Sequence, residues 1–235
     1  MELFKVELLK LKRSSLLSLG IIFPIIIVIF TFSKVLGMEK IAELGLSEGI
    51  YMFSSMAFIT LFLPLYIIYV ACMVTKVEND NNGWRGLMLF PIKKTSIYLS
   101  KYKVMLYLLI ITTLSYIVSV NILVFILGNN FILDSIKYSL QIIITTLPII
   151  TLLFITGRRF ISIIPVITTG VIMLITNIFI AQSKFWIYAP WTYSMMISGG
   201  AITNKERYII LMVSIILSLI MFTIDFIDFT KSDIK

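Results

Sequence analysis

The chain has 235 residues, of which 59% are hydrophobic, and it carries 20 Lys and Arg against 12 Asp and Glu, a formal net charge of +8. Its mean hydropathy is +1.03, and a chain this apolar cannot hide its hydrophobic surface from water by folding on itself. The composition therefore excludes an ordinary soluble domain and indicates a protein that lies largely inside a membrane.

The first fourteen residues form a short amphipathic segment. Phe4, Leu8 and Leu11 recur at i, i+4 and i+7, whereas Glu7 and the neighbouring lysines supply a polar side. Two interpretations are compatible with this pattern: a basic flank that orients the following apolar run, or an interfacial helix attracted to anionic headgroups. The following run is as long as a full span, which favours a retained anchor over a cleaved signal peptide.

Six uncharged stretches of 17 to 30 residues make up most of the remaining chain. A helix rises ~1.5 Å per residue, so about 20 apolar residues cross the ~30 Å hydrocarbon layer. Lipid offers the backbone no hydrogen-bond partners, and the runs lack the alternation typical of a barrel, so helices are expected. We therefore predict an all-α polytopic membrane protein, with one domain over residues 1–235 and six transmembrane helices at about 15–33, 50–75, 104–128, 139–157, 160–182 and 208–226.

The basic residues are unevenly distributed between the two sides of this arrangement. Fourteen of the 20 fall in the N-terminal segment, the second and fourth loops and the C-terminal tail, and 6 fall on the other side. The positive-inside rule then places both termini in the cytoplasm, as expected for an even number of spans in the cell membrane. The positive charge is explained by topology, and no nucleic-acid partner is expected.

The longest inner loop, 76–103, contains an unusual apolar patch. It begins with the acidic Glu78, continues through Asn and Gly residues that favour a turn, and then predicts a short helix from Trp84 to residue 90 that Pro91 ends. A solvated loop seldom gathers so many large apolar side chains. The patch either lies on the membrane or fits a groove in another protein, and the residues alone leave both interpretations open.

Two further connections carry distinctive residues. Arg158 and Arg159 form a very short inner loop, for which a tight hairpin held inside by its charge is a sufficient explanation. On the outer side, an aromatic stretch broken by Pro190 matches the Trp and Tyr that concentrate at membrane–water boundaries. The alternative is a short re-entrant element that contacts an amphipathic substrate. Its key aromatic residues are Trp186, Tyr188, Trp191 and Tyr193.

The chain lacks most residues that carry catalysis. It contains no His and no P-loop, H-E-x-x-H or C-x-x-C motif, so we expect no enzyme activity, no metal site and no cofactor bound by this chain. The lone Cys72 excludes an intrachain disulfide. No charged residue lies deep in a span, which disfavours an ion-coupled carrier. Asp225 and Asp228 fall at the inner end of the last span, where we expect water to reach them.

The loop sequence E-N-D-N-N-G-W-R-G-L-M-L-F-P-I-K-K-T-S-I-Y-L-S-K resembles the region between the second and third spans of type-2 ABC exporter permeases. The shared order is an acidic residue, a Gly, a short apolar helix, a Pro followed by basic residues, and a Lys before the next span. Together with the N-terminal E-L-L-K-L-K-R-S and the outer Y-A-P-W-T-Y, this pattern is most similar to permease subunits of lantibiotic-immunity ABC transporters of the epidermin and mutacin type.

The resemblance implies roles for particular residues. The coupling helix, which docks in a cleft of a separate ATPase, would involve Glu78, Trp84, Arg85, Leu89 and Pro91, and a second inner contact would involve Arg158 and Arg159. An interfacial elbow helix would contain Phe4, Glu7, Leu8 and Leu11. The outer aromatic residues Trp186, Tyr188, Trp191 and Tyr193 would provide one contact for the substrate.

The function implied is that of a membrane-spanning subunit of an exporter that expels a cationic amphipathic peptide antibiotic. ATP and magnesium would bind the partner ATPase, present in two copies, and a second six-span permease would complete a heterodimer, with a homodimer as the alternative. Membrane lipid surrounds the assembly. The alternative functions are an ABC permease for a lipid, drug or other small molecule, and a membrane scaffold whose loop binds a different cytosolic protein.

Overall fold

The computed structural model describes residues 2–11, 14–35, 46–79, 93–128, 134–199 and 202–231. Within these ranges every regular element is helical, which confirms the all-α prediction. The elements are α1 (Glu2–Leu11), α2 (Leu16–Val35), α3 (Leu46–Ala57), η2 (Phe58–Phe62), α4 (Leu63–Asn79), α6 (Lys94–Ile126), α7 (Asp134–Arg159), α8 (Ile164–Ile180), η4 (Lys184–Tyr188), η5 (Pro190–Thr192), α9 (Tyr193–Ser198) and α10 (Asn204–Lys231).

Five helical stretches of the described chain are long and apolar enough to cross a membrane: Leu16–Val35, Glu48–Lys76, Lys94–Ile126, Ser135–Arg159 and Asn204–Lys231. They coincide with five of the predicted spans. The remaining predicted span, 160–182, corresponds to the shorter apolar helix α8. With 17 residues, α8 is about 25 Å long, less than the ~30 Å of a typical hydrocarbon layer. The six-span count therefore stays a prediction.

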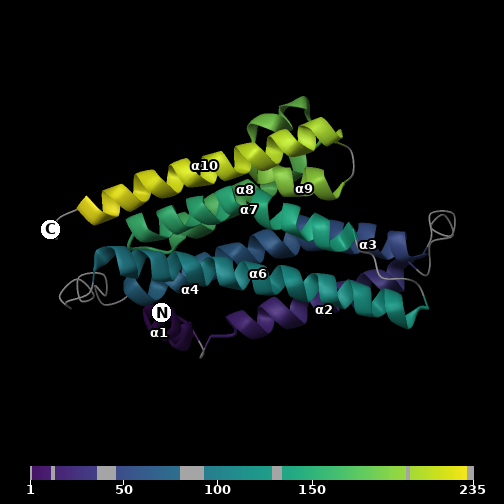
Figure 1. Cartoon of the computed structure of the whole chain (residues 1–235), viewed down its shortest axis with the longest axis horizontal. Helices are drawn as coiled ribbons and strands as arrows, with labels where there is room; N and C mark the ends of the chain where they lie inside the picture. Colours follow the sequence, from purple (N-terminus) through teal and green to yellow (C-terminus); the bar gives the residue numbers. More distant parts are fainter. Residues whose placement is uncertain are drawn as a thin grey trace.

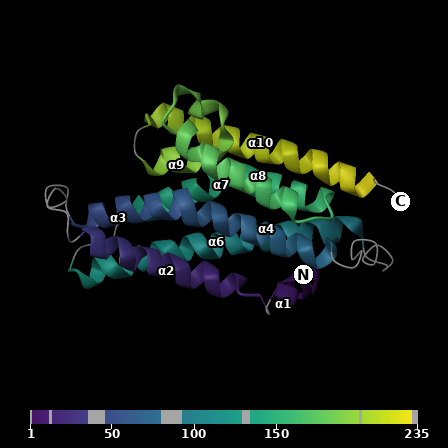
Figure 2. The ribbon, with the colours of Figure 1, turned by 180° about the vertical axis from the view of Figure 1, so that it is seen from behind.

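The long helices run roughly parallel to one axis and form an elongated bundle (Figure 1). The N-terminal helix α1 and the C-terminal end of α10 lie at the same end, and both views agree on this (Figures 1 and 2). Helix α2 packs against α6, α10 packs against α7, and α4 contacts both α7 and α8. The first and the last described helix therefore have their free ends at the same end of the bundle.

Helix α6 begins well before the apolar run that predicted it. The third span was expected to start at residue 104, but the helix already starts at Lys94. Basic residues such as Lys101 and Lys103 were expected to belong to the loop and instead form the first three turns of α6. Lys101 is fully buried there and forms an ion pair with Glu7 of α1.

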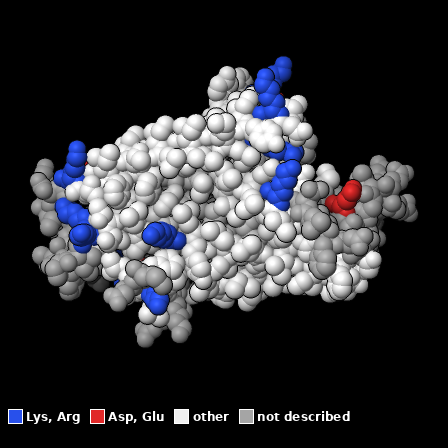
Figure 3. Space-filling view, in the orientation of Figure 1, with Lys and Arg blue, Asp and Glu red and all other residues white. Residues whose placement is uncertain are grey.

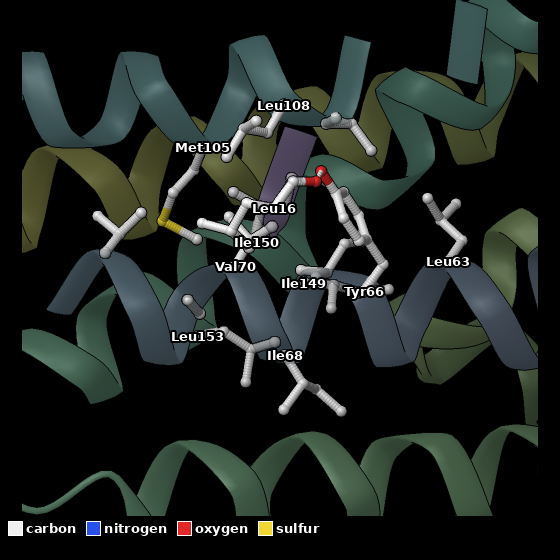
Figure 4. Close-up of a cluster of buried hydrophobic side chains, with 14 of the residues drawn as sticks. Leu16, Leu63, Tyr66, Ile68, Val70, Met105, Leu108, Ile149, Ile150 and Leu153 are labelled. Atoms are coloured by element: carbon white, nitrogen blue, oxygen red, sulfur yellow. Dashed lines mark hydrogen bonds between the residues drawn. The ribbon is translucent and has the colours of Figure 1, made fainter. Parts of the chain in front are cut away.

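The buried core surrounds α4, the most enclosed helix of the bundle. Figure 4 shows Tyr66, Ile68 and Val70 of α4 among side chains from α6 and α7, with Leu16 of α2 beside them. The Tyr66 hydroxyl donates a hydrogen bond to the Leu16 carbonyl at 3.0 Å, which satisfies a polar group inside an otherwise apolar cluster. Many large apolar side chains are exposed on the outward faces of the helices, and most of the face seen in Figure 3 is uncharged, which suits contact with lipid.

A π-helical turn, η2, interrupts the long helix that α3 and α4 otherwise continue. Phe58 in this turn is fully buried and stacks on Tyr116 of α6, with ring centroids 4.4 Å apart and an interplanar angle of 8°. The Tyr116 hydroxyl also lies 2.9 Å from the Ser54 hydroxyl. The extra residue of a π-turn redirects the face of a helix, and here it keeps both ends of the span against the core.

Gly20 permits the closest approach between α2 and its neighbours. A Cβ atom at this position would lie 2.5 Å from the Tyr66 hydroxyl oxygen and 2.6 Å from the Thr112 hydroxyl oxygen. Both distances are too short for real atoms, so any larger residue would force α2 away from α4 and α6. Such small residues let membrane helices approach closely, because lipid provides no hydrophobic force that drives helices together.

We expect Gly20→Val to destabilise the bundle by about 1–3 kcal/mol, the usual effect of overpacking a close contact. The measurement is thermal unfolding of the purified protein in detergent. Gly199→Ala is the matched control, because its Cβ would lie 3.4 Å from the nearest atom, an ordinary contact. Equal melting temperatures for the two variants would contradict the close packing of α2.

Candidate functional site

Charged side chains gather at the end of the bundle where both chain termini lie. Figure 3 shows Lys and Arg grouped at this end, at the left of the view. Helices α4, α7 and α10 end here, and α1 and α6 begin here. We call this region the charged end. It contains two separate groups of ion pairs, one on α7 and α10 and one on α1 and α6.

The first group is centred on Asp225 of α10, which is only 1% exposed. Arg158, near the end of α7, donates from Nε to Asp225 Oδ2 at 2.9 Å and from Nη2 to Asp225 Oδ1. The guanidinium fork thus holds both carboxylate oxygens at once, the geometry that makes Arg–carboxylate pairs strong and orientation-specific. Contrary to the sequence expectation, Asp225 is not in contact with water but forms the centre of an internal ion pair.

Helix α6 joins the same group through an aromatic side chain. The hydroxyl of Tyr98, which is fully buried, donates to Asp225 Oδ2 at 3.0 Å. The Arg158 guanidinium also lies over the Phe229 ring, 5.4 Å from its centroid, a distance at which cation–π attraction operates. Tyr98, Arg158 and Asp225 therefore tie α6, α7 and α10 together at the charged end.

Arg159 and Asp228 form the outer part of this group. Arg159 donates from Nε to Asp225 Oδ1 at 3.2 Å and from Nη2 to Asp228 Oδ2 at 3.4 Å. Their side chains are 48% and 54% exposed, whereas that of Arg158 is 10% exposed. The two adjacent arginines, to which the sequence assigned one role, thus differ: Arg158 points into the protein and Arg159 toward its surface.

The second group joins the N-terminal helix to α6. Glu7 accepts from Lys101 Nζ and from Lys10 Nζ, both at 2.9 Å. Glu7 is only 8% exposed and Lys101 is fully buried. Glu7, which was expected on the polar side of this helix, therefore faces the protein interior. Phe4 meets Tyr107 of α6 edge to face, at 5.7 Å between centroids. Helix α1 is thereby fixed to the bundle by both charge and packing.

The coupling-helix residues of the sequence prediction fall mostly outside the described residues. Trp84, Arg85, Leu89 and Pro91 lie in the range 80–92, and Glu78 is described only as part of the α4 backbone. The described flanks are nevertheless informative. Helix α4 ends at Asn79 and α6 begins at Lys94, both at the charged end. The described flanks of the predicted coupling segment therefore lie at the same end of the molecule as the Arg158–Asp225 group.

The outer aromatic stretch lies at the opposite end, in η4, η5 and α9. Ser183 caps η4 by accepting from the Phe185 amide, and Tyr193 donates to the Ile187 carbonyl at 2.5 Å. Tyr193 is only 4% exposed, and burial raises the pKa of its hydroxyl. Tyr188 is 81% exposed, and Trp186 is half-buried. Among the four aromatic residues, Tyr188 and Trp186 thus remain accessible and Tyr193 holds the stretch together.

Trp191 lines a cavity of about 190 Å³ between α7, α8, α10 and η5. It also borders a smaller space that contains Asn177 of α8, which is 2% exposed. Neither Trp191 Nε1 nor Asn177 Oδ1 has a hydrogen-bond partner among the described residues. Sequence reasoning had no signal for this pair, because the hydropathy of α8 does not show that its one amide side chain, Asn177, lies beside Trp191 of another element.

No group of three or more His, Cys, Asp or Glu side chains in the described part of the chain is arranged to hold a metal ion. The charged groups at the charged end form ion pairs that join helices to one another. Several apolar helices of spanning length, with charge restricted to their ends, define a multi-pass membrane protein.

Residues 3–177 match the family model described as "ABC-2 family transporter protein", and the chain belongs to this family. It is therefore a permease subunit of an ABC transporter, a class of membrane subunit that works with an ABC ATPase subunit. No curated protein matches the chain. No solved structure matches it either.

We expect Asp225→Ala to destabilise the protein much more than Asp228→Ala. Removing the buried carboxylate leaves the Arg158 guanidinium without its main partner, which typically costs about 3–5 kcal/mol. Loss of the exposed Asp228 should cost at most about 1 kcal/mol. Thermal unfolding in detergent measures both, and similar melting temperatures for the two variants would show that Asp225 does not centre the group.

Glu7→Gln should loosen α1, because Lys101 then stays buried beside α1 without this carboxylate. We expect faster hydrogen exchange of the α1 backbone amides, measured by mass spectrometry. Lys10→Gln is the control, since the Lys10 side chain is 31% exposed and the Glu7–Lys101 pair remains. Unchanged exchange in Glu7→Gln would indicate that packing alone holds α1.

Proposed function

We propose that this permease subunit belongs to an ABC exporter whose cargo is a cationic amphipathic peptide antibiotic, and that the charged end faces its ATPase in the cytoplasm. The observation that carries the proposal is the family match combined with the ion-paired end on which α4, α6, α7 and α10 converge. Force applied there reaches several spans directly.

The orientation rests on charge. The described charged end contains Lys5, Lys10, Lys93 and Lys94 in addition to the arginines at the end of α7. The excess of basic residues on this side supports a cytoplasmic location for both termini. In this arrangement α8 serves as a short sixth span. Bilayers adapt to short helices by local thinning at a modest cost.

The ATPase contact would consist of the segment that contains Glu78, Trp84, Arg85, Leu89 and Pro91, together with Arg159. The two arginines differ in their surroundings. Arg158 is paired with the buried Asp225, whereas the Arg159 side chain is half exposed and is the better candidate for a contact with the ATPase. An apolar segment that inserts into a cleft of a partner matches the coupling-helix role implied by the resemblance.

The cargo assignment rests on the resemblance to lantibiotic-immunity permeases and on the exposed aromatic groups at the outer end. Tyr188 and Trp186 present amphipathic rings there, suited to a peptide that itself lies at the membrane–water boundary. A second permease would complete a heterodimer above two ATPase copies, and a homodimer is the alternative. A lipid, drug or other small molecule is the alternative cargo, and a non-transport scaffold is the alternative function.

The test is co-purification of the tagged full-length chain with its ABC ATPase subunit, followed by measurement of ATP hydrolysis in the complex. We expect Trp84→Ala to weaken the association at least about tenfold, because buried Trp residues dominate interface energies. Tyr188→Ala, at the opposite end, is the control and should leave the association intact while lowering the resistance of cells to the peptide. Equal association of both variants with the ATPase would contradict the docking assignment.

Transport itself needs a separate measurement. Cells that express the complete transporter should survive higher concentrations of a cationic lantibiotic than cells with an ATPase variant unable to hydrolyse ATP. If survival is equal while ATPase binding is normal, the cargo assignment is wrong and the permease assignment stands.

A further inference from the structure

A groove of about 820 Å³ lies between α1 and the first half of α6. We call it the α1–α6 groove, and its volume falls in the range of ~300–1,000 Å³ that is typical of small-molecule sites. The residues that matter for the argument are Phe4, Ser96, Lys103, Leu106, Tyr107 and Ile110.

Chemistry changes along the groove in one direction. On α6 the lining runs from the charged end toward the middle of the bundle in the order Ser96, Leu99, Ser100, Lys103, Leu106, Tyr107 and Ile110, so that its one lysine and both serines precede Leu106. These positions recur every three or four residues and therefore share one face of the helix. From Ser96 to Ile110 the groove follows α6 for ~21 Å. It is thus polar and cationic at its end and apolar at depth.

No described acidic side chain compensates the charge in the groove. Glu7, the acidic residue of α1 whose side chain the structure describes, is already bound by Lys101 and Lys10. Lys103 is exposed and forms no ion pair or hydrogen bond with the described residues. A cation held beside an apolar groove at the membrane boundary attracts a molecule with an anionic head and an apolar tail.

We infer that the α1–α6 groove binds an anionic phospholipid from the leaflet at the charged end. The phosphate lies at the Lys103 ammonium, with the Ser96 and Tyr107 hydroxyls as neutral donors, and one acyl chain follows Leu106 and Ile110. Because Phe4 of α1 closes one side through its contact with Tyr107, the lipid bridges the N-terminal helix and the span. This site is independent of the cargo and of the ATPase.

The test is native mass spectrometry of the full-length protein in neutral detergent, titrated with phosphatidylglycerol or with phosphatidylcholine of identical acyl chains. We expect the wild-type protein to bind phosphatidylglycerol more tightly, and Lys103→Gln to weaken that binding about fivefold, the effect of one lysine near an anionic lipid surface. Lys103→Arg should preserve it. Ile110→Trp, which fills the groove, should weaken binding of both lipids.

Lys184→Gln is the matched control, because it removes the same charge from an exposed lysine at the opposite end. Equal losses in Lys103→Gln and Lys184→Gln would mean that only overall charge matters, and would overturn the site. So would unchanged binding in Lys103→Gln, or equal affinity of the wild-type protein for the two lipids. Unchanged binding in Ile110→Trp would refute the path of the acyl chain.

Discussion

Hydrocarbon offers no hydrogen-bond partners, and this constraint governs where every polar group of the chain is found. Many Ser and Thr hydroxyls inside the spans donate to a carbonyl of their own helix: Thr75 donates to the Ala71 carbonyl at 2.7 Å and Thr113 donates to the Leu109 carbonyl at 2.8 Å. Full charges are excluded from the middle of the spans and collect at their ends. Where an end is packed against other helices, the charges there must be paired.

The two ion-paired groups meet this requirement, and each forms a contact between helices at the charged end, which we call a joint. Asp225 is buried by the convergence of α6, α7 and α10, and Arg158 and the Tyr98 hydroxyl donate to its carboxylate there. Glu7 and Lys101 solve the same problem between α1 and α6. Helix α6 takes part in both joints. A displacement of the first turns of α6 would therefore shift α1 on one side and α7 and α10 on the other, as expected when packed elements move as rigid bodies.

Hydropathy predicted the helical class and the positions of five long spans, because the length of an apolar run is a local property that the bilayer reads directly. It placed the start of α6 ten residues late. Lys94, Lys101 and Lys103 looked like solvated loop residues, whereas the Glu7 carboxylate, on a helix 94 residues away in sequence, pairs with the buried Lys101. The Arg158–Asp225 pair escaped prediction for the same reason, since it joins positions 67 residues apart. Pairing across helices leaves no periodic signature in one sequence.

Different parts of the chain support the assignment of the family and the assignment of the cargo. A family model reads the run of spans and their junctions, and it covers residues 3–177, which excludes the outer aromatic stretch and the last span. Those parts carry the accessible rings of Trp186 and Tyr188. They also carry Trp191, which lines a cavity together with α10 and with the parts of α7 and α8 that lie inside the matched range. Recognition of a cargo depends on a few such side chains on a common scaffold, so proteins of one fold transport unrelated molecules.

Trp191 Nε1 and Asn177 Oδ1 are buried polar atoms without a hydrogen-bond partner among the described residues. A buried donor and a buried acceptor that border one space lose free energy until something polar joins them.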